Sequence, residues 1–120
     1  MKAGKRELII TIVKKGYGDT VLEASMKAGA EGGTVLFGRG IGIHEKKKIM
    51  GLRIEPEKEI VLTATPPDMT KTILDAIVKE ARLGVPGMGI AFTVPINSFV
   101  GVVHAQLEES SENTSDQSGD

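Results

Sequence analysis

Apolar residues along this chain gather in short runs that are separated by glycines and charged residues. Leu8 to Val13 reads LIITIV, a continuous run rich in β-branched residues, which is typical of a strand buried on both faces. The segment His44 to Met50 is polar and basic, so we interpret it as a loop. The pattern predicts strands at Leu8 to Val13, at Thr34 to Phe37, at Leu52, Ile54 and Ile60 to Ala64, and at Ile90 to Ile96.

A first helix is predicted between the first two strands. The glycines at 16 and 18 end the first strand, and Asp19 is placed to act as the N-cap of the helix. A helix that starts there would carry Lys27 near its C-terminal end, where a cation suits the helix dipole. Its buried face would consist of Leu22, Ser25, Met26 and Gly29.

The second helix has the clearest pattern in the chain. Apolar residues recur at every fourth position from Met69 to Ala81 and form one stripe along the helix. The preceding segment, Thr65 to Asp68, predicts the cap, with a proline at the first helical position and an acid soon after it. Gly84 stands where a glycine commonly ends a helix at the C′ position. Pro95, in the last predicted strand, indicates an edge strand or a bulge.

The resulting order, β-α-β-β-α-β, predicts a ferredoxin-like α+β fold with one antiparallel sheet and two helices on one face. Two helices cover only one face of a four-stranded sheet. The strand runs LIITIV and IVLTA are nevertheless apolar on both faces. We therefore expect another subunit to cover the second face, and predict an oligomer.

Composition narrows the class of protein. The 120 residues contain no Cys, which excludes disulfides, thiol chemistry and cysteine metal sites. No apolar run approaches the ~20 residues of a membrane-spanning helix, and we expect a cytoplasmic protein. The C-terminal stretch from Leu107 carries five acids and no Lys or Arg, which leaves a net basic body. We predict a folded domain at 1–105 and a disordered acidic tail at 106–120.

The connection from Arg82 to Phe92 combines three glycines, Gly84, Gly87 and Gly89, between the second helix and the last strand. Glycine lets backbone pass close to a ligand or adopt positive φ. Several backbone N–H groups in such a connection can surround one anion. This segment is therefore the first candidate for a binding site.

Three stretches resemble the PII nitrogen-regulatory signalling family over about Arg6 to His104. Gly33 to Val35, followed by Arg39 to Gly42, is similar to the second strand of that family where it enters the flexible T-loop. Pro56 to Thr63 is similar to the strand that returns from the loop. Leu83 to Phe92 resembles the glycine-rich B-loop.

The resemblance implies a homotrimer with small-molecule effector sites in the clefts between subunits. An adenine nucleotide would bind there as an effector. The family consists of regulators, so no cofactor would be required. Carried over by position, the B-loop residues would line the phosphates, Thr34 would lie near the base or ribose, and Gly40 and Gly42 would form the T-loop base. The predicted cofactor-binding residues are Thr34, Arg39, Gly40, Gly42, Gly84, Gly87, Met88 and Gly89.

This chain departs from the family where phosphate charge would be neutralised. The B-loop lysine falls at Ile90, the two C-terminal arginines near Gly101 and Val103, and the third-strand lysine near Glu57. The glutamine that helps to bind Mg-ATP and 2-oxoglutarate falls at His44. Because a charge-assisted contact contributes about 1.5–3 kcal/mol, we expect AMP, ADP or a cyclic nucleotide to bind in preference to ATP. A replacement cation would come from Arg39, His44 or Arg53.

The loop between Gly42 and Pro56 is shorter than a full T-loop and contains no Tyr, Ser or Thr. It therefore has no acceptor for uridylylation or phosphorylation. The resemblance implies that the loop contacts a regulated transporter or nitrogen-metabolism enzyme, with membrane association only through such a partner. The candidate partner-binding residues are His44, Lys46, Lys47 and Lys48, although a solvated basic loop explains them equally well.

Three other functions are weaker interpretations. The only histidines, His44 and His104, have no neighbouring nucleophile or HExxH-type spacing, so we expect no catalytic residues. A CutA-like metal-tolerance trimer shares the architecture, but we predict no intrachain metal site. One run of three lysines without aromatic platforms does not indicate nucleic-acid binding. A ligand-independent trimeric interaction module remains the alternative to a PII-like regulator.

Overall fold

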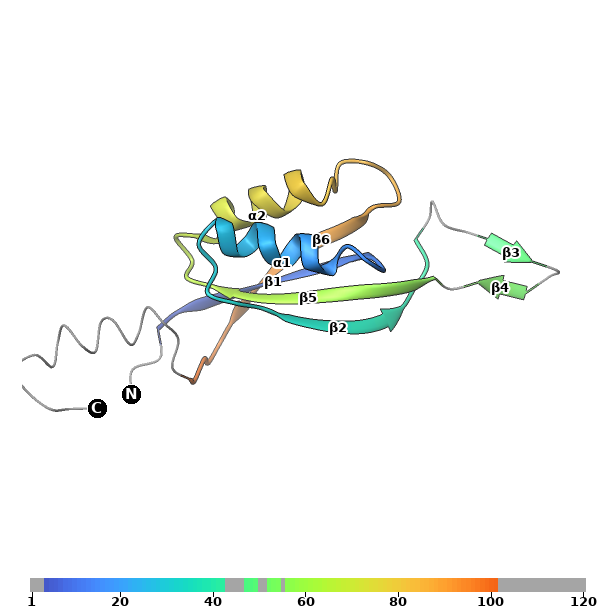
Figure 1. Ribbon diagram of the computed structural model, residues 1–120. Coiled ribbons are helices and arrows are strands. Elements are labelled where there is room, and N and C mark those ends of the chain that lie inside the picture. The colour runs from blue at the N-terminus through green and yellow to red at the C-terminus, as the bar shows by residue number, and fades with distance from the viewer. Residues whose placement is uncertain (1–3, 43–46, 50–51, 55, 102–120) are drawn as a thin grey trace, which may run out of the picture.

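The computed structural model describes residues 4–42, 47–49, 52–54 and 56–101. Figure 1 shows two helices lying on one face of a sheet, with a narrow two-stranded hairpin extending from one end of that sheet. The elements are β1 (Arg6–Lys14), α1 (Gly18–Lys27), β2 (Thr34–Arg39), β3 (Lys47–Ile49), β4 (Leu52–Ile54), β5 (Glu57–Thr65), α2 (Thr70–Glu80) and β6 (Gly89–Ile96).

The main sheet has the strand order β2-β5-β1-β6, and every neighbouring pair is antiparallel. This is the ferredoxin-like arrangement, so the predicted fold class is confirmed. Strand β6 lies at an edge of the sheet, which suits Pro95 because proline cannot donate a ladder hydrogen bond.

The hairpin corrects two predictions. Lys47–Ile49 is strand β3, so interpreting His44 to Met50 as a loop was wrong for those three residues. The expected third strand is divided in two, because β4 pairs only with β3 in a separate sheet and β5 alone belongs to the main sheet. Short periodic runs predict strands but not which partner each strand has.

The start of α1 also differs from the prediction. The helix begins at Gly18 with Tyr17 as its N-cap, and Asp19 lies in the first turn without capping it. The Glu59 carboxylate instead accepts hydrogen bonds from the backbone N–H groups of Gly16 at 3.0 Å and Gly18 at 2.7 Å. A carboxylate from β5 therefore performs the role predicted for Asp19.

Helix α2 begins at Thr70 with Met69 as N-cap, later than the predicted cap at Thr65 to Asp68. The helix reaches its C-cap at Ala81, and Arg82 then adopts a left-handed φ of 57°. Arg82 thus occupies the conformation predicted for Gly84. Because an arginine and not a glycine takes this left-handed position, the residue types in the sequence did not indicate where α2 ends.

The core lies between the helices and the sheet. The predicted stripe of α2 is confirmed at Ile73, Ile77 and Ala81, which are all fully or almost fully buried. The predicted face of α1 is wrong at Met26, which is half exposed, because Val21 and Ala24 are buried instead. The buried cluster consists of Ile9, Val13, Val21, Ala30, Val61, Ile73, Ile77 and Ala81.

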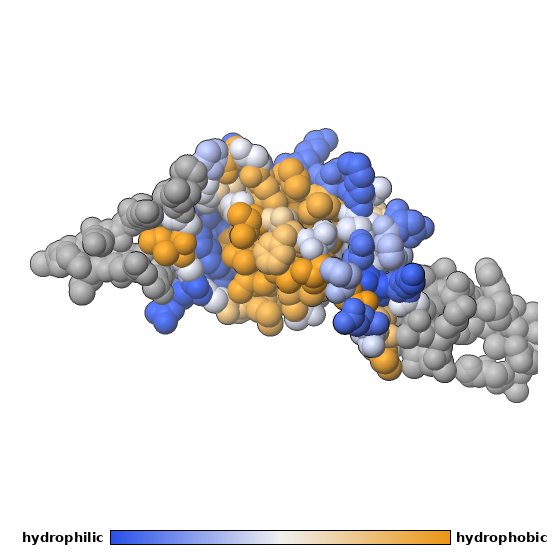
Figure 2. All heavy atoms as spheres, turned by 180° about the vertical axis from the view of Figure 1, so that it is seen from behind, coloured by the Kyte–Doolittle hydropathy of each residue, from blue (hydrophilic) through white to orange (hydrophobic). Residues whose placement is uncertain are grey.

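The other side of the sheet, here called the open face, is also apolar. Residues directly opposite one another in neighbouring strands point to the same side of a sheet. The register places three apolar rows there: Ile60, Ile12 and Ile90; Leu62, Ile10 and Phe92; and Ala64, Leu8 and Val94. Ile90 is 58% exposed and Phe92 42%. Apolar residues also form a continuous area across the middle of the molecule in Figure 2.

Candidate functional site

A hollow of about 290 Å³ lies at the end of the open face where β2 leaves the sheet and β6 begins. We call it the Lys58 hollow. Its floor is formed by open-face isoleucines, and its rim by the last residues of β2 and the first residues of β6. The lining residues are Ile12, Arg39, Gly40, Ile41, Gly42, Lys58, Ile60, Gly89 and Ile90.

Gly89 shapes one wall of the Lys58 hollow. It has a φ of 150° and lies in register with Val13. A Cβ atom at Gly89 would overlap the carbonyl oxygen of Ile12 and lie 3.0 Å from Val13 Cγ1. Only glycine therefore allows the start of β6 to approach β1 this closely.

The opposite wall is the point where the chain turns away toward the hairpin. The Gly40 N–H donates to the Pro56 carbonyl at 3.2 Å, which joins the two ends of the hairpin-bearing segment. Lys58 lies close to Gly40, since a Cβ atom at Gly40 would be in ordinary van der Waals contact with Lys58 Cγ at 3.9 Å. The base of the hairpin is thus part of the wall of the hollow.

Two cations, Arg39 and Lys58, line this hollow, and no acid is among its described lining residues. Lys58 is only 8% exposed, an unusual burial for a lysine. Its register partners, Lys14 and Gly38, place it on the open face. The sequence prediction did not single out Lys58.

Glu57, where the family's strand lysine was expected, does not line the hollow. Its carboxylate lies 2.8 Å from Lys15 Nζ in an exposed ion pair. The hydrogen bond and the charge of Lys15 lower the pKa of Glu57, and the same contact raises the pKa of Lys15. Successive side chains of a strand point to opposite faces of the sheet. Glu57 and Lys58 are neighbours in β5 and therefore lie on opposite faces.

The predicted B-loop residues do not all line this hollow. Gly87 has a positive φ of 85° and follows a turn in which the Val85 N–H donates to the Arg82 carbonyl at 3.0 Å. The Met88 side chain is buried and contributes to packing. Of the predicted B-loop residues, Gly89 lines the hollow, whereas Gly84, Gly87 and Met88 do not.

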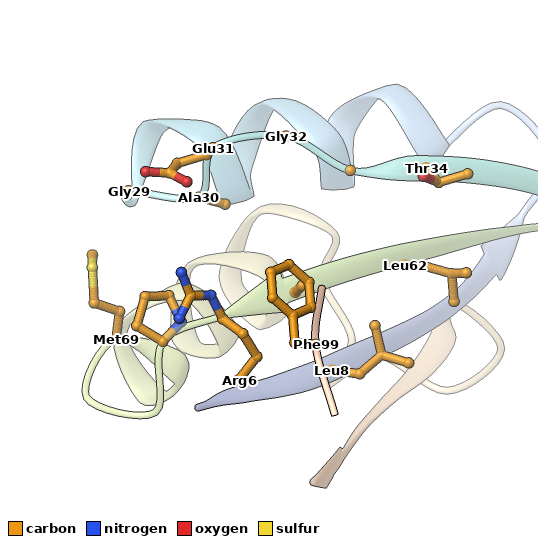
Figure 3. Close-up of a pocket in the computed structure, with 13 residues that line it drawn as sticks. Arg6, Leu8, Gly29, Ala30, Glu31, Gly32, Thr34, Leu62, Met69 and Phe99 are labelled. Atoms are coloured by element: carbon orange, nitrogen blue, oxygen red, sulfur yellow. The ribbon is translucent and has the colours of Figure 1, made fainter. Parts of the chain in front are cut away.

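Thr34 lines a second and larger hollow of about 510 Å³, which we call the Phe99 hollow. Figure 3 shows its lining side chains, with Arg6 and Phe99 next to one another below the Gly29–Gly32 connection. Thr34 and Arg39 stand at opposite ends of β2, ~17 Å apart at ~3.3 Å per residue. The lining residues are Arg6, Leu8, Gly29, Ala30, Glu31, Gly32, Gly33, Thr34, Leu62, Ala64, Pro66, Met69 and Phe99.

Within one chain, five of the eight predicted cofactor-binding residues line one of the two hollows, whereas Gly84, Gly87 and Met88 line neither. Arg39, Gly40, Gly42 and Gly89 meet in the Lys58 hollow, and Thr34 belongs to the Phe99 hollow. Both hollows take their floor from the open face, because Ile12 and Ile60 line the first, and Leu8, Leu62 and Ala64 line the second.

Of the predicted partner-binding residues, His44 and Lys46 lie outside the described residues. Lys47 and Lys48 belong to β3, where they pair with Ile54 and Arg53 of β4. Within the described ranges, no group of three or more His, Asp or Glu side chains is arranged to hold a metal ion. In the same part of the chain, no helix has the length and apolarity needed to cross a membrane.

Comparison with known proteins places this geometry in context. A structural neighbour is the crystal structure of a Bacillus cereus protein related to NIF3, with a TM-score of 0.60 and 16% sequence identity. The alignment covers 81% of this chain and 27% of that chain, so the likeness concerns the fold. No curated protein matches this chain. The family model of nitrogen regulatory protein P-II matches residues 6–105. This chain therefore belongs to the P-II nitrogen regulatory protein family.

Proposed function

We propose that this chain is a PII-like signal-transduction regulator that binds an adenine nucleotide in clefts between the subunits of a homotrimer. P-II proteins are signalling regulators rather than enzymes. The observation that carries the proposal is the Lys58 hollow, in which two cations, and no acid among the described residues, adjoin a glycine-limited approach of β6 to β1. Cations beside close backbone suit a phosphate group.

The open face supports the trimeric part of the proposal. Its apolar rows extend across the β5–β1 and β1–β6 pairings of the sheet and leave Phe92 and Ile90 substantially exposed in one chain. An exposed apolar area of this kind marks an interface in soluble proteins. Since both hollows have their floors on the open face, copies that cover this face would convert the hollows into clefts between subunits.

The number of cations limits the charge of the effector. Ile90 stands at the edge of the Lys58 hollow, where the family resemblance places a lysine, and Arg39 and Lys58 remain as its basic lining residues. A triphosphate carries more charge than two cations neutralise. AMP, ADP or a cyclic nucleotide therefore fits this hollow better than ATP.

The proposed output is the hairpin of β3 and β4, which corresponds to the T-loop. Gly40 both lines the Lys58 hollow and bonds to Pro56, so an effector that contacts the hollow also contacts the base of the hairpin. Lys47 and Lys48 in β3 would contact an acidic surface of a transporter or nitrogen-metabolism enzyme. We therefore propose a cytoplasmic protein that associates with a membrane only through its partner.

Isothermal titration of the full chain with AMP, ADP, ATP and cyclic AMP tests the proposal, with light scattering to measure the oligomeric state. We expect AMP or ADP to bind, and Lys58→Met to weaken that binding at least tenfold. Lys71→Met removes the same charge from the exposed surface of α2 and should leave affinity unchanged. A trimer that binds none of the four nucleotides would instead support a ligand-independent interaction module.

A further inference from the structure

The Lys58 hollow and the acidic tail of the same chain are complementary in charge. Arg39 and Lys58 line the hollow, and no acid is among its described lining residues. The tail at 106–120, which lies outside the described residues, contains five acids and no Lys or Arg. Carboxylates form their strongest hydrogen bonds with Arg and Lys side chains. The chain therefore carries its own anionic candidate for this hollow.

The hollow should attract a carboxylate more strongly than the exposed cations of the body. Lys58 is only 8% exposed, and the isoleucines around it lower the local dielectric, which strengthens the attraction between opposite charges. An exposed pair such as Lys71 and Asp75 on α2 contributes little by comparison. Among the described cations, those of the hollow are therefore the best site for the tail.

The tail starts at the end of the sheet that is opposite to this hollow. Strand β6 begins with Gly89 in the wall of the hollow and ends with Ile96, the register partner of Arg6. The centre of the Phe99 ring lies 5.1 Å from the Arg6 guanidinium carbon, so the chain remains near this end after β6. Figure 1 shows the end of β6 and the hairpin at opposite ends of the sheet. The tail must therefore return along β6, over ~23 Å at ~3.3 Å per residue.

The tail is long enough for this return. Glu109 stands eight residues beyond Gly101, the last described residue, and Glu112 stands eleven residues beyond it. An extended chain reaches about 26–29 Å over eight residues and about 36–40 Å over eleven. A flexible segment of eleven residues has an r.m.s. length of ~17–20 Å. Because this length is close to the span, the tether holds its acids at a roughly millimolar effective concentration.

We propose that the acidic tail binds in the Lys58 hollow as an internal competitor of the anionic effector. A tail carboxylate beside Lys58 and Arg39 would occupy the place of a phosphate. Docking of the tail depends only on charge and reach, whereas its role as a competitor rests on the proposed function. Gly40 joins the hollow to the base of the hairpin, so an effector that displaces the tail would also change the contacts of that base.

A spin label on the tail tests docking directly. The chain has no Cys, so a nitroxide on Ser111→Cys labels the tail alone. We expect it to broaden the amide NMR signals of Gly89 and Ile90 in the hollow more than those of α2. Lys58→Met and added AMP should each relieve this broadening. Equal broadening of the hollow and of α2 would refute docking.

Neutralising the tail at constant length tests competition. We expect AMP to bind about three- to tenfold more tightly to this variant in isothermal titration at low salt. The gain should shrink as salt is raised, because salt screens the tail acids, and it should be absent when Lys58→Met is added. Exchanging two exposed helix acids, Glu23→Gln with Glu80→Gln, is the control for overall charge and should change affinity less than twofold. The tail substitutions are Glu108→Gln, Glu109→Gln, Glu112→Gln, Asp116→Asn and Asp120→Asn.

The outcomes separate this inference from the proposed function. If AMP binds wild type and the neutralised variant equally and the label broadens no signal of the hollow, the tail inference is refuted and the proposed function stands. Broadening in the hollow without binding of any nucleotide upholds docking and refutes the proposed function. Broadening with unchanged AMP affinity, or an equal gain in the helix control, refutes the competition. Melting temperature and light scattering verify that each variant is folded and assembled.

Discussion

Replacing Gly89 by alanine tests the close approach that shapes the Lys58 hollow. The added Cβ would overlap the carbonyl oxygen of Ile12 and lie 3.1 Å from Val13 Cα, both backbone atoms of the central strand β1. Backbone atoms in a paired strand cannot rotate away as a side chain can. The start of β6 must therefore move out of register with β1, or the sheet must open locally.

Two terms set the size of the effect. A non-glycine residue held at a φ of 150° costs about 1–3 kcal/mol. Overpacking against a fixed neighbour adds about 1–3 kcal/mol. We therefore expect Gly89→Ala to lower the free energy of unfolding by roughly 2–6 kcal/mol. For a domain of this size, this is a fall in Tm of about 10 °C or more.

Gly84→Ala in the same connection is the matched control. Gly84 does not have a positive φ, and a Cβ atom there would meet no atom within 4 Å. We expect this variant to be neutral or about 0.4–1 kcal/mol more stable, because alanine restricts the unfolded chain. Thermal and urea unfolding followed by circular dichroism, at one protein concentration because assembly affects Tm, compare the pair. Equal Tm values for Gly89→Ala and Gly84→Ala would refute the close approach.

Three further variants test the charges and the open face. Ile90→Lys adds a third cation to the Lys58 hollow, and one charge-assisted contact of ~1.5–3 kcal/mol should raise ATP affinity by at least tenfold in isothermal titration; an unchanged affinity would contradict the placement of the phosphate. Phe92→Asp places a carboxylate on the open face at a cost of roughly 3–5 kcal/mol in an interface, so light scattering should show monomers, whereas Val78→Asp on the exposed side of α2 should leave the oligomer intact. The lowered pKa of Glu57 means that its ion pair stabilises the fold above the ordinary value of 4.5 and that this stability is lost as pH falls through the lowered pKa. Glu57→Gln should therefore reduce the fall in urea midpoint at acidic pH, and an identical pH profile would show that the Lys15 contact does not form in solution.

The fold was predictable because its main signals are local and periodic. The run Leu8 to Val13 and the four-residue spacing from Met69 to Ala81 each determine an element and the face it buries. Apolar residues on both faces of β1 also predicted an uncovered side of the sheet, which the register confirms for one chain. These inferences need no information about distant parts of the chain.

The helix ends could not be predicted because their determinants are distant or depend on the backbone. Glu59 contacts the start of α1 from 41 residues further along the chain, so the nearby Asp19 was a misleading cap candidate. Arg82 takes a left-handed conformation that propensity assigns to glycine, which displaced the predicted end of α2. In both places tertiary contacts outweigh the local preference.

The candidate site was predicted in part. Arg39, Gly40, Gly42 and Gly89 come from distant segments, and the structure brings them to one hollow. Their binding of an effector stays a prediction. Position along the chain could not decide whether Glu57 or Lys58 faces the candidate site. A shift of one residue along a strand exchanges the two faces of the sheet. The order of residues also could not show that Thr34 lines a different hollow from Arg39.

Because Lys58 is buried, this hollow would prefer a ligand of low charge and would still bind that ligand tightly. Lys58 lies beside Ile12 and Ile60, whose apolar side chains lower the local dielectric. One cation in such surroundings attracts a single phosphate strongly, and covering the open face would exclude water. Each additional phosphate needs its own counter-charge, and at the edge of the hollow it would meet Ile90. The number of cations would therefore limit the charge of the effector, while the apolar surroundings would maintain the affinity for the first phosphate.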